Sequence, residues 1–239
     1  MENRLEQFLT LKKELQARPF VRANINAQKP DGLKYWKYRL LRPFYKLKYL
    51  RFQKQNPSLP WLTPDSIVVL KKMIRGGKGL EFGSGRSTVF FSKLLNELDS
   101  VEHHQGWFDS VKESFEAQGI SNVTLHHRPA NGATEMPHLS SEQQVFLDED
   151  QFPQKDDLFK NYINVLDQFE DESLDFILVD GRARKSCALR AGKKLKQGGL
   201  LVLDNSERIR YKEVHITYES WPLIQTTTGL TDTTIWIKP

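Results

Sequence analysis

The sequence has little cysteine and no long apolar segment. Its 239 residues include one cysteine, Cys187, so an internal disulfide is excluded and a reducing compartment is expected. No apolar run approaches the ~20 residues that span a bilayer. Residues 1–6 carry acids where a secretory signal would be apolar. We therefore expect a cytoplasmic protein in which Cys187 is a small buried core residue.

Acidic residues are absent from one stretch, residues 33–54, which holds eight Lys or Arg and seven aromatic residues. Residues 1–59 contain 14 Lys and Arg against 4 Asp and Glu, whereas residues 60–239 contain 21 against 26. The net charge of +5 therefore comes from the N-terminal part alone. We predict a basic helical extension over residues 1–59 and a separate body over residues 60–239.

The extension shows two helical patterns. Apolar residues at positions 5, 8, 11 and 15 predict a helix over residues 2–18, which Pro19 ends. Pro43 predicts a break within residues 33–54. Three roles stay open for that segment: a helical cover packed on the body, peripheral contact with an anionic membrane surface, and contact with RNA.

The body alternates between two kinds of pattern. Strands are predicted at residues 79–82, 100–103, 123–127, 174–179 and 199–203, and helices at residues 88–98, 107–118, 158–169 and 185–196. This alternation predicts a parallel sheet with helices on both faces. Residues 221–227 and 233–237 have no helix between them and predict a closing antiparallel hairpin. The body is thus an α/β domain with a mostly parallel seven-stranded sheet, and residues 131–157 form a long polar loop.

Polar residues follow four of the predicted strands. They are Glu81, Gly83, Ser84 and Gly85 after the first strand, Glu102 and His103 after the second, Asp180 after the fourth, and Asp204 and Asn205 after the fifth. Ligands bind at the carboxyl ends of the strands in open parallel sheets. Glycines let a backbone approach a ligand closely, and a helix that opens at Ser87 and Thr88 offers its first N–H groups to an anion. This edge of the sheet is the predicted site.

The same residues restrict the ligand. Glu102, 21 residues after Glu81, can accept hydrogen bonds from two ribose hydroxyls. A dinucleotide is disfavoured because Thr88 replaces the third glycine of its fingerprint and because the carboxylate of Glu81 would repel a pyrophosphate. That carboxylate suits a ligand that carries an ammonium group.

With this motif order the body resembles the class I methyltransferases that use S-adenosylmethionine. The resemblance rests on Glu81-Phe82-Gly83-Ser84-Gly85, on Glu102 and on Asp180, and it covers about residues 60–239. It implies a Rossmann-like fold and roles for each matching residue. By this resemblance, Gly83, Ser84 and Gly85 would border the cofactor. Glu81 would lie near its ammonium group, and the backbone of Ser87 and Thr88 would face its carboxylate. Glu102 would bind its ribose, His103 would lie beside its adenine, and Asp180 would lie near the reactive methyl group.

The acceptor side leaves alternatives open. Asp180, Asp204 and Asn205 also resemble the Mg²⁺ ligands of the catechol and caffeoyl-CoA type O-methyltransferases, although Arg182 and Arg184 depart from that pattern. We predict methyl transfer to oxygen of a small-molecule or saccharide-like acceptor, with Asp180 as the catalytic residue. The alternatives are RNA methylation guided by the basic extension and a non-catalytic module that keeps the nucleoside site.

Overall fold

The computed structural model describes residues 4–16, 32–131 and 155–239. Three helices precede the sheet: α1 (Arg4–Gln16), α2 (Gly32–Gln55) and α3 (Pro64–Met73). The first half of the sheet and its connections are β1 (Lys78–Phe82), α4 (Arg86–Ser92), β2 (Glu97–Glu102), α5 (Gln105–Gln118) and β3 (Val123–His127). The second half comprises α7 (Lys155–Leu158), α8 (Lys160–Ile163), η2 (Asn164–Gln168), β4 (Leu174–Val179), α9 (Arg184–Lys194), β5 (Leu195–Asp204), η3 (Ile209–Tyr211), α10 (Lys212–Thr217), β6 (Leu223–Thr227) and β7 (Asp232–Ile237).

The seven strands form one sheet in the order β3-β2-β1-β4-β5-β7-β6. The pairs from β3 to β5 are parallel, whereas β7 is antiparallel to both β5 and β6. The chain moves outward from β1 to β3 and then returns to the other side of β1 for β4. This reversal places a topological switch point between β1 and β4, where ligands bind in open α/β sheets. The predicted fold class, a mostly parallel seven-stranded sheet with a closing hairpin and N-terminal helices, is confirmed.

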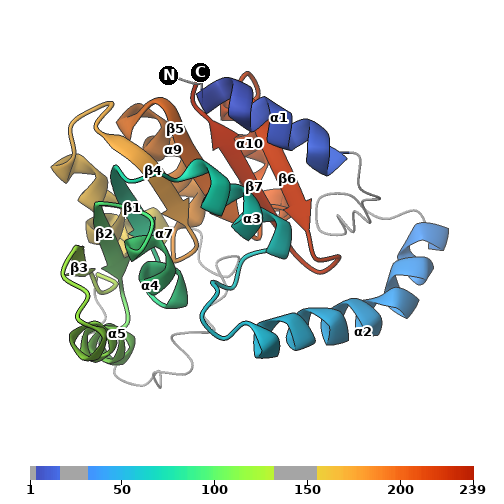
Figure 1. The fold of residues 1–239 in the computed structure, drawn as a ribbon, viewed down its shortest axis with the longest axis horizontal. Helices are drawn as coiled ribbons and strands as arrows, with labels where there is room; N and C mark the ends of the chain where they lie inside the picture. The colour runs from blue at the N-terminus through green and yellow to red at the C-terminus, as the bar shows by residue number, and fades with distance from the viewer. Residues whose placement is uncertain (1–3, 17–31, 132–154) are drawn as a thin grey trace.

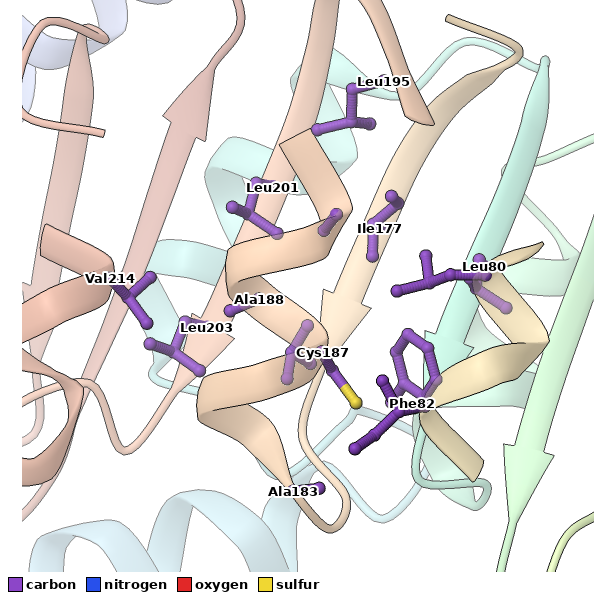
Figure 2. Close-up of a cluster of buried hydrophobic side chains, with 14 of the residues drawn as sticks. Leu80, Phe82, Ile177, Ala183, Cys187, Ala188, Leu195, Leu201, Leu203 and Val214 are labelled. Carbon is purple, nitrogen blue, oxygen red and sulfur yellow. The ribbon is translucent and has the colours of Figure 1, made fainter. Parts of the chain in front are cut away.

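Helices cover both faces of the sheet, and each face has its own apolar core (Figure 1). Alternate residues of β4 point to opposite faces: Phe176 and Leu178 pack toward α1, α3 and α4, whereas Ile177 and Val179 pack toward α8 and α9. A strand that is buried on both faces needs this continuous apolar sequence. Figure 2 shows Cys187 on α9 pointing into the second core beside Phe82, and it is fully buried there, as predicted.

Helix α1 packs on the body. Its residues Phe8 and Leu11 are buried in the same core as α3, and Arg4 reaches the carbonyl of Met73 and the carboxylate of Asp175. The predicted boundary between residues 59 and 60 stays a prediction, but α1 is part of the packed core on this face. The predicted end of this helix at Pro19 lies outside the described residues, and so does most of the predicted loop 131–157.

Several predicted boundaries were wrong. The helix predicted over residues 88–98 ends at Ser92, and residues from Glu97 onward belong to β2. The strand predicted over 199–203 starts earlier, at Leu195, and β2 ends at Glu102, one residue before His103. Tertiary pairing decides these ends, because Glu97 pairs with Lys78 of β1 and Leu195 with Leu174 of β4.

The predicted break at Pro43 was also wrong, since α2 is continuous from Gly32 to Gln55 with Pro43 inside it. Proline removes one backbone hydrogen bond and crowds the carbonyl of residue i−4, here Arg39. Both Pro43 and Arg39 are exposed. Water can therefore satisfy the carbonyl that proline leaves without a donor.

Candidate functional site

The loops after β1 and β4 touch through two glycines. Gly83 has a φ of +103°, and a Cβ at this position would lie 2.8 Å from the backbone of Gly181. A Cβ at Gly181 would in turn meet the Tyr162 hydroxyl and the amide of Gly83. The predicted need for glycine at position 83 thus has a local cause: the two loops at the switch point pack backbone to backbone.

Glu81 is the centre of a buried hydrogen-bond network. Its Oε2 accepts bonds from the hydroxyls of Thr88 (2.5 Å) and Ser100 (2.8 Å). Ser100 is its cross-strand partner on β2 and also contacts the hydroxyl of Ser84 at 2.7 Å. The other oxygen, Oε1, is buried and receives no hydrogen bond of good geometry from any residue that the structure describes. Burial raises the pKa of Glu81 to about 7, against the opposing effect of the nearby hydroxyls.

Thr88 explains why the loop lacks a third glycine. Its hydroxyl accepts a bond from the amide of Gly85 (2.8 Å) while it donates to Glu81, so it connects the loop backbone to the buried carboxylate. The Thr88 amide already donates to the carbonyl of Gly85 (3.1 Å). A ligand carboxylate would therefore have to share this amide, which limits the role predicted for the Thr88 backbone.

Glu102 is almost fully buried at the end of β2 and is held by the loop that follows. Its Oε1 accepts bonds from the amides of His103 and His104, both at 2.8 Å, and lies 2.7 Å from Nδ1 of His103. Its Oε2 accepts a longer bond from the amide of Ser84 (3.3 Å). Burial acts to raise the pKa of Glu102, but these donors hold it below its ordinary value. An ionised carboxylate with one lightly used oxygen can accept further hydrogen bonds from hydroxyl groups.

His103 joins this network to the loop after β4. Its Nε2 accepts a bond from Nε of Arg182 (3.3 Å), and its ring contacts Phe159 and Tyr162 edge to face. Trp107, at the start of α5, donates from Nε1 to the carbonyl of Ser84 (2.6 Å). Aromatic side chains thus contact both His103 after β2 and the loop after β1.

Arg184 organises a second cluster at the ends of β4 and β5. Its guanidinium donates to the carbonyls of Asp180 (2.7 Å), Gly181 (3.0 Å) and Asp204 (2.8 Å). It also pairs with Oδ1 of Asp180 (2.9 Å) and donates to Oδ1 of Asn205 (3.0 Å). The three residues predicted as possible metal ligands are therefore brought together, but around a fixed guanidinium.

This arrangement does not fit Mg²⁺. A hard cation needs close oxygen ligands at about 2.0–2.1 Å, and here those oxygens already face the positive charge of Arg184. Within residues 4–16, 32–131 and 155–239, no group of three or more His, Cys, Asp or Glu side chains is placed to hold a metal ion. We therefore derive no step through Mg²⁺.

The carboxyls of Asp180 and Asp204 lie close enough to share a proton. Burial, followed by the neighbouring charge of Asp180, raises the pKa of Asp204 to about 8. Burial likewise raises the pKa of Asp180, while Arg184 opposes that rise. Asp180 is the more accessible of the two, with 23% of its side chain exposed against 5% for Asp204. The pair can thus take up and release a proton near neutral pH.

Three parts of the site were missed from the sequence. Ser100 lies two residues before Glu102 on the same face of β2, and this spacing could have revealed it. Arg184 lies four residues after Asp180. Its positive charge is evident from the sequence, but the position of its guanidinium between the ends of β4 and β5 is not. Burial, followed by the charge of the nearby Asp204, raises the pKa of Tyr49 on α2 to about 12, and no local pattern could have placed a residue from the extension there.

The comparisons with known proteins support the fold. No family model matches the sequence, and no curated protein matches it. Among solved structures, a methyltransferase-like protein from Silicibacter pomeroyi DSS-3 aligns with a TM-score of 0.52 at 20% identity, over 76% of this chain and 89% of that one. The precorrin 8w decarboxylase from Methanobacterium thermoautotrophicum aligns with a TM-score of 0.51 at 14% identity, over 77% and 95%. These similarities, all below 25% identity, support a Rossmann-like fold.

Proposed function

We propose that this protein transfers a methyl group from S-adenosylmethionine to an oxygen atom of a small-molecule or saccharide-like acceptor. The observation that carries the proposal is the buried network that joins Glu81, Thr88, Ser84 and Glu102 through Ser100. It lies at the switch point of a methyltransferase-type sheet. Among the residues that the structure describes, Oε1 of Glu81 receives no hydrogen bond of good geometry, although the Ser87 hydroxyl lies near this carboxylate, and Oε2 of Glu102 receives only a long bond.

These two oxygens fit the proposed cofactor. A buried acceptor without a donor is unfavourable by about 1–3 kcal/mol, so Oε1 of Glu81 suits an ammonium group, directly or through water. Oε2 of Glu102 suits the hydroxyls of a ribose, and His103 and Trp107 suit the flat faces of an adenosine. Gly83, Ser84 and Gly85 would border the cofactor between them, with Ser87 at the start of α4 toward its carboxylate.

The acceptor chemistry is assigned to Asp180. When bound, the cofactor supplies a methyl group on a positively charged sulfur. Asp180 would accept the acceptor's hydroxyl proton as the new carbon–oxygen bond forms and the carbon–sulfur bond breaks, with the electron pair left on sulfur. Arg184 fixes the Asp180 carboxylate in position. Arg182 offers a positive charge beside the same loop that could orient an anionic group of the acceptor.

A binding and turnover experiment tests this function. We expect S-adenosylmethionine and S-adenosylhomocysteine to bind in calorimetry at micromolar concentrations, since the site fits the parts that both share. A panel of hydroxylated, saccharide and RNA acceptors, assayed in EDTA for S-adenosylhomocysteine formation, then identifies the acceptor class. Absence of binding at high micromolar concentrations would overturn the proposal, and binding without turnover would indicate a non-catalytic module.

Glu81→Gln gives a separate prediction from pH. The pKa of Glu81 is raised on folding from 4.5 to about 7, so the folded state keeps a proton that the unfolded state loses, and its stability falls as pH rises between these values. Glutamine cannot ionise. The stability of the variant relative to wild type should therefore increase by on the order of 3 kcal/mol from pH 4.5 to pH 8.

Denaturant melts of both proteins at the two pH values measure this change without any ligand. The same variant should bind S-adenosylmethionine more weakly at pH 7.5, because it loses the negative charge opposite the ammonium. An equal stability difference at both pH values would show that Glu81 is not buried as an ionisable acid.

A further inference from the structure

Helix α2 lies beyond the carboxyl ends of the parallel strands, toward β6 (Figure 1). A methyl group added at Gly229, in the turn between β6 and β7, would come within 2.8 Å of the ring of Tyr45. Four residues further on, Tyr49 is partly buried near Asp204 and Asp180. Gln53 accepts a bond from Arg86 at the start of α4 (3.5 Å). The inner face of α2 thus packs against the turn between β6 and β7 and contacts the start of α4, with Tyr49 near Asp204 and Asp180.

The opposite face of α2 is apolar and exposed. Leu33, Leu40, Phe44 and Leu47 are exposed by 87%, 72%, 68% and 65%. At 100° per residue these four side chains fall within an arc of about 60°, so they form one stripe from Leu33 to Leu47, which we call the outer stripe. The exposed Arg51 continues the same face beyond Leu47 with a positive charge. An aligned set of large apolar side chains in water usually marks an interaction surface.

Basic residues border the exposed apolar face on both sides. Lys37 and Lys48 lie about 20° and 40° beyond one edge of the outer stripe. Beyond the other edge, Trp36 and Leu50 widen the apolar face, with 65% and 52% of their surface exposed. Arg39 and Lys46 follow beyond these two residues, and all four basic residues are exposed. Helix α2 carries eight Lys or Arg in total and no acidic residue. An apolar stripe between basic borders is the pattern of a helix that lies in a lipid–water interface.

The charges and apolar side chains of α2 favour an anionic bilayer over a second copy of the chain or RNA. A second copy of the chain would bring two acid-free basic helices together, and their charges would repel. RNA would satisfy the basic side chains through its phosphates, but three of the four outer-stripe residues are leucines, which offer bases no stacking surface. An anionic bilayer accepts both features, because its lipid headgroups attract Lys and Arg while its acyl region takes up leucine and phenylalanine.

We propose that the outer stripe of α2 binds an anionic membrane surface, so that α2 lies between the bilayer and the acceptor side of the site and keeps that side within about one helix diameter of the lipid. The inner face of the same helix carries Tyr45 and Tyr49 over that side. The acceptor is then a hydroxyl carried in or at a bilayer, a conclusion that rests on the proposed methyl transfer. The membrane contact itself does not depend on that function.

Vesicle flotation tests the contact with the full-length protein and no cofactor. We expect binding to vesicles with 30% phosphatidylglycerol, and binding at least tenfold weaker to pure phosphatidylcholine or in high salt. Leu40→Gln with Leu47→Gln should weaken binding to the anionic vesicles by about tenfold or more. Lys37→Gln with Lys48→Gln should do so by a similar factor.

Matched controls change the same residue types elsewhere. Val68→Gln with Ile216→Gln alters exposed apolar residues on α3 and α10, and Lys93→Gln with Lys112→Gln alters exposed lysines. Both controls should float like wild type. Equal flotation of all variants, or a dimer in light scattering that the outer-stripe variant dissociates, would overturn the proposal.

The acceptor is tested separately with labelled S-adenosylmethionine and vesicles of total bacterial lipid. Label in the organic phase is expected, and label that stays entirely in the aqueous phase would refute a lipid-borne acceptor. Because flotation needs no cofactor, a failure of methyl transfer can be distinguished from a failure of membrane binding.

Discussion

Glu102→Gln should weaken the binding of S-adenosylmethionine roughly 100-fold. Hydrogen bonds to a charged group contribute about 1.5–3 kcal/mol each, and a loss of about 3 kcal/mol corresponds to that factor. The Glu102 carboxylate is buried and held ionised by the amides of His103 and His104. It is thus poised to accept from ribose hydroxyls without reorganising. Calorimetry at pH 7.5 measures the dissociation constant.

Two further variants test whether the loss of affinity is specific to the carboxylate of Glu102. Glu97→Gln changes an exposed glutamate at the opposite end of the same strand and should bind like wild type. Glu102→Asp keeps the charge but withdraws it by one methylene group, so an intermediate loss is expected. Thermal melts confirm that each variant is folded, since Glu102 also supports the His103–His104 loop. Unchanged affinity in a folded Glu102→Gln protein would remove the ribose assignment.

Asp180→Asn should lower kcat by 10²–10⁴-fold, the range that general base catalysis usually contributes. The amide oxygen of asparagine can still accept the bond from Arg184, so the loop between β4 and α9 should keep its structure. Binding of S-adenosylmethionine should change little, because Asp180 belongs to the acceptor side. The measurement is initial-rate kinetics with the acceptor that the panel identifies.

The pH dependence separates a base from a residue that only positions the loop. Wild-type kcat should rise as the Asp180–Asp204 pair loses its proton, toward a pH of about 8. The asparagine variant should lose this rise. Asp171→Asn, an exposed aspartate paired with Lys194, is the control and should keep both the rate and the profile. An Asp180→Asn enzyme that retains more than a tenth of wild-type kcat would contradict the assignment.

The alternation of short apolar runs, typical of strands, with helical patterns was sufficient to predict the sheet, and two apolar runs without a helix between them predicted its closing hairpin. The residues at which helices and strands begin and end were less predictable. Residues 88–98 look helical as a sequence, yet Glu97 and Leu98 pair with β1 and join β2. Proline at position 43 predicts a break, yet α2 continues through it because the affected carbonyl is exposed. In both cases the environment overrides a local preference, which a sequence pattern does not report.

The sequence by itself determined the class of fold and which polar residues gather at the carboxyl ends of β1 and β2. The residues concerned come from two neighbouring strands, from the loop after β1 and from the first turn of α4; they are Glu81, Gly83, Ser84, Thr88 and Glu102. The carboxyl ends of neighbouring parallel strands lie at the same edge of a sheet, so these residues come together. Only the tertiary structure decided which residues surround Asp180 and Asp204. Arg184 lies between two strand ends, and Tyr49 reaches Asp204 across 155 positions of sequence. Such contacts depend on how distant elements pack and on which face of a helix turns inward, and neither is encoded in a short stretch of chain.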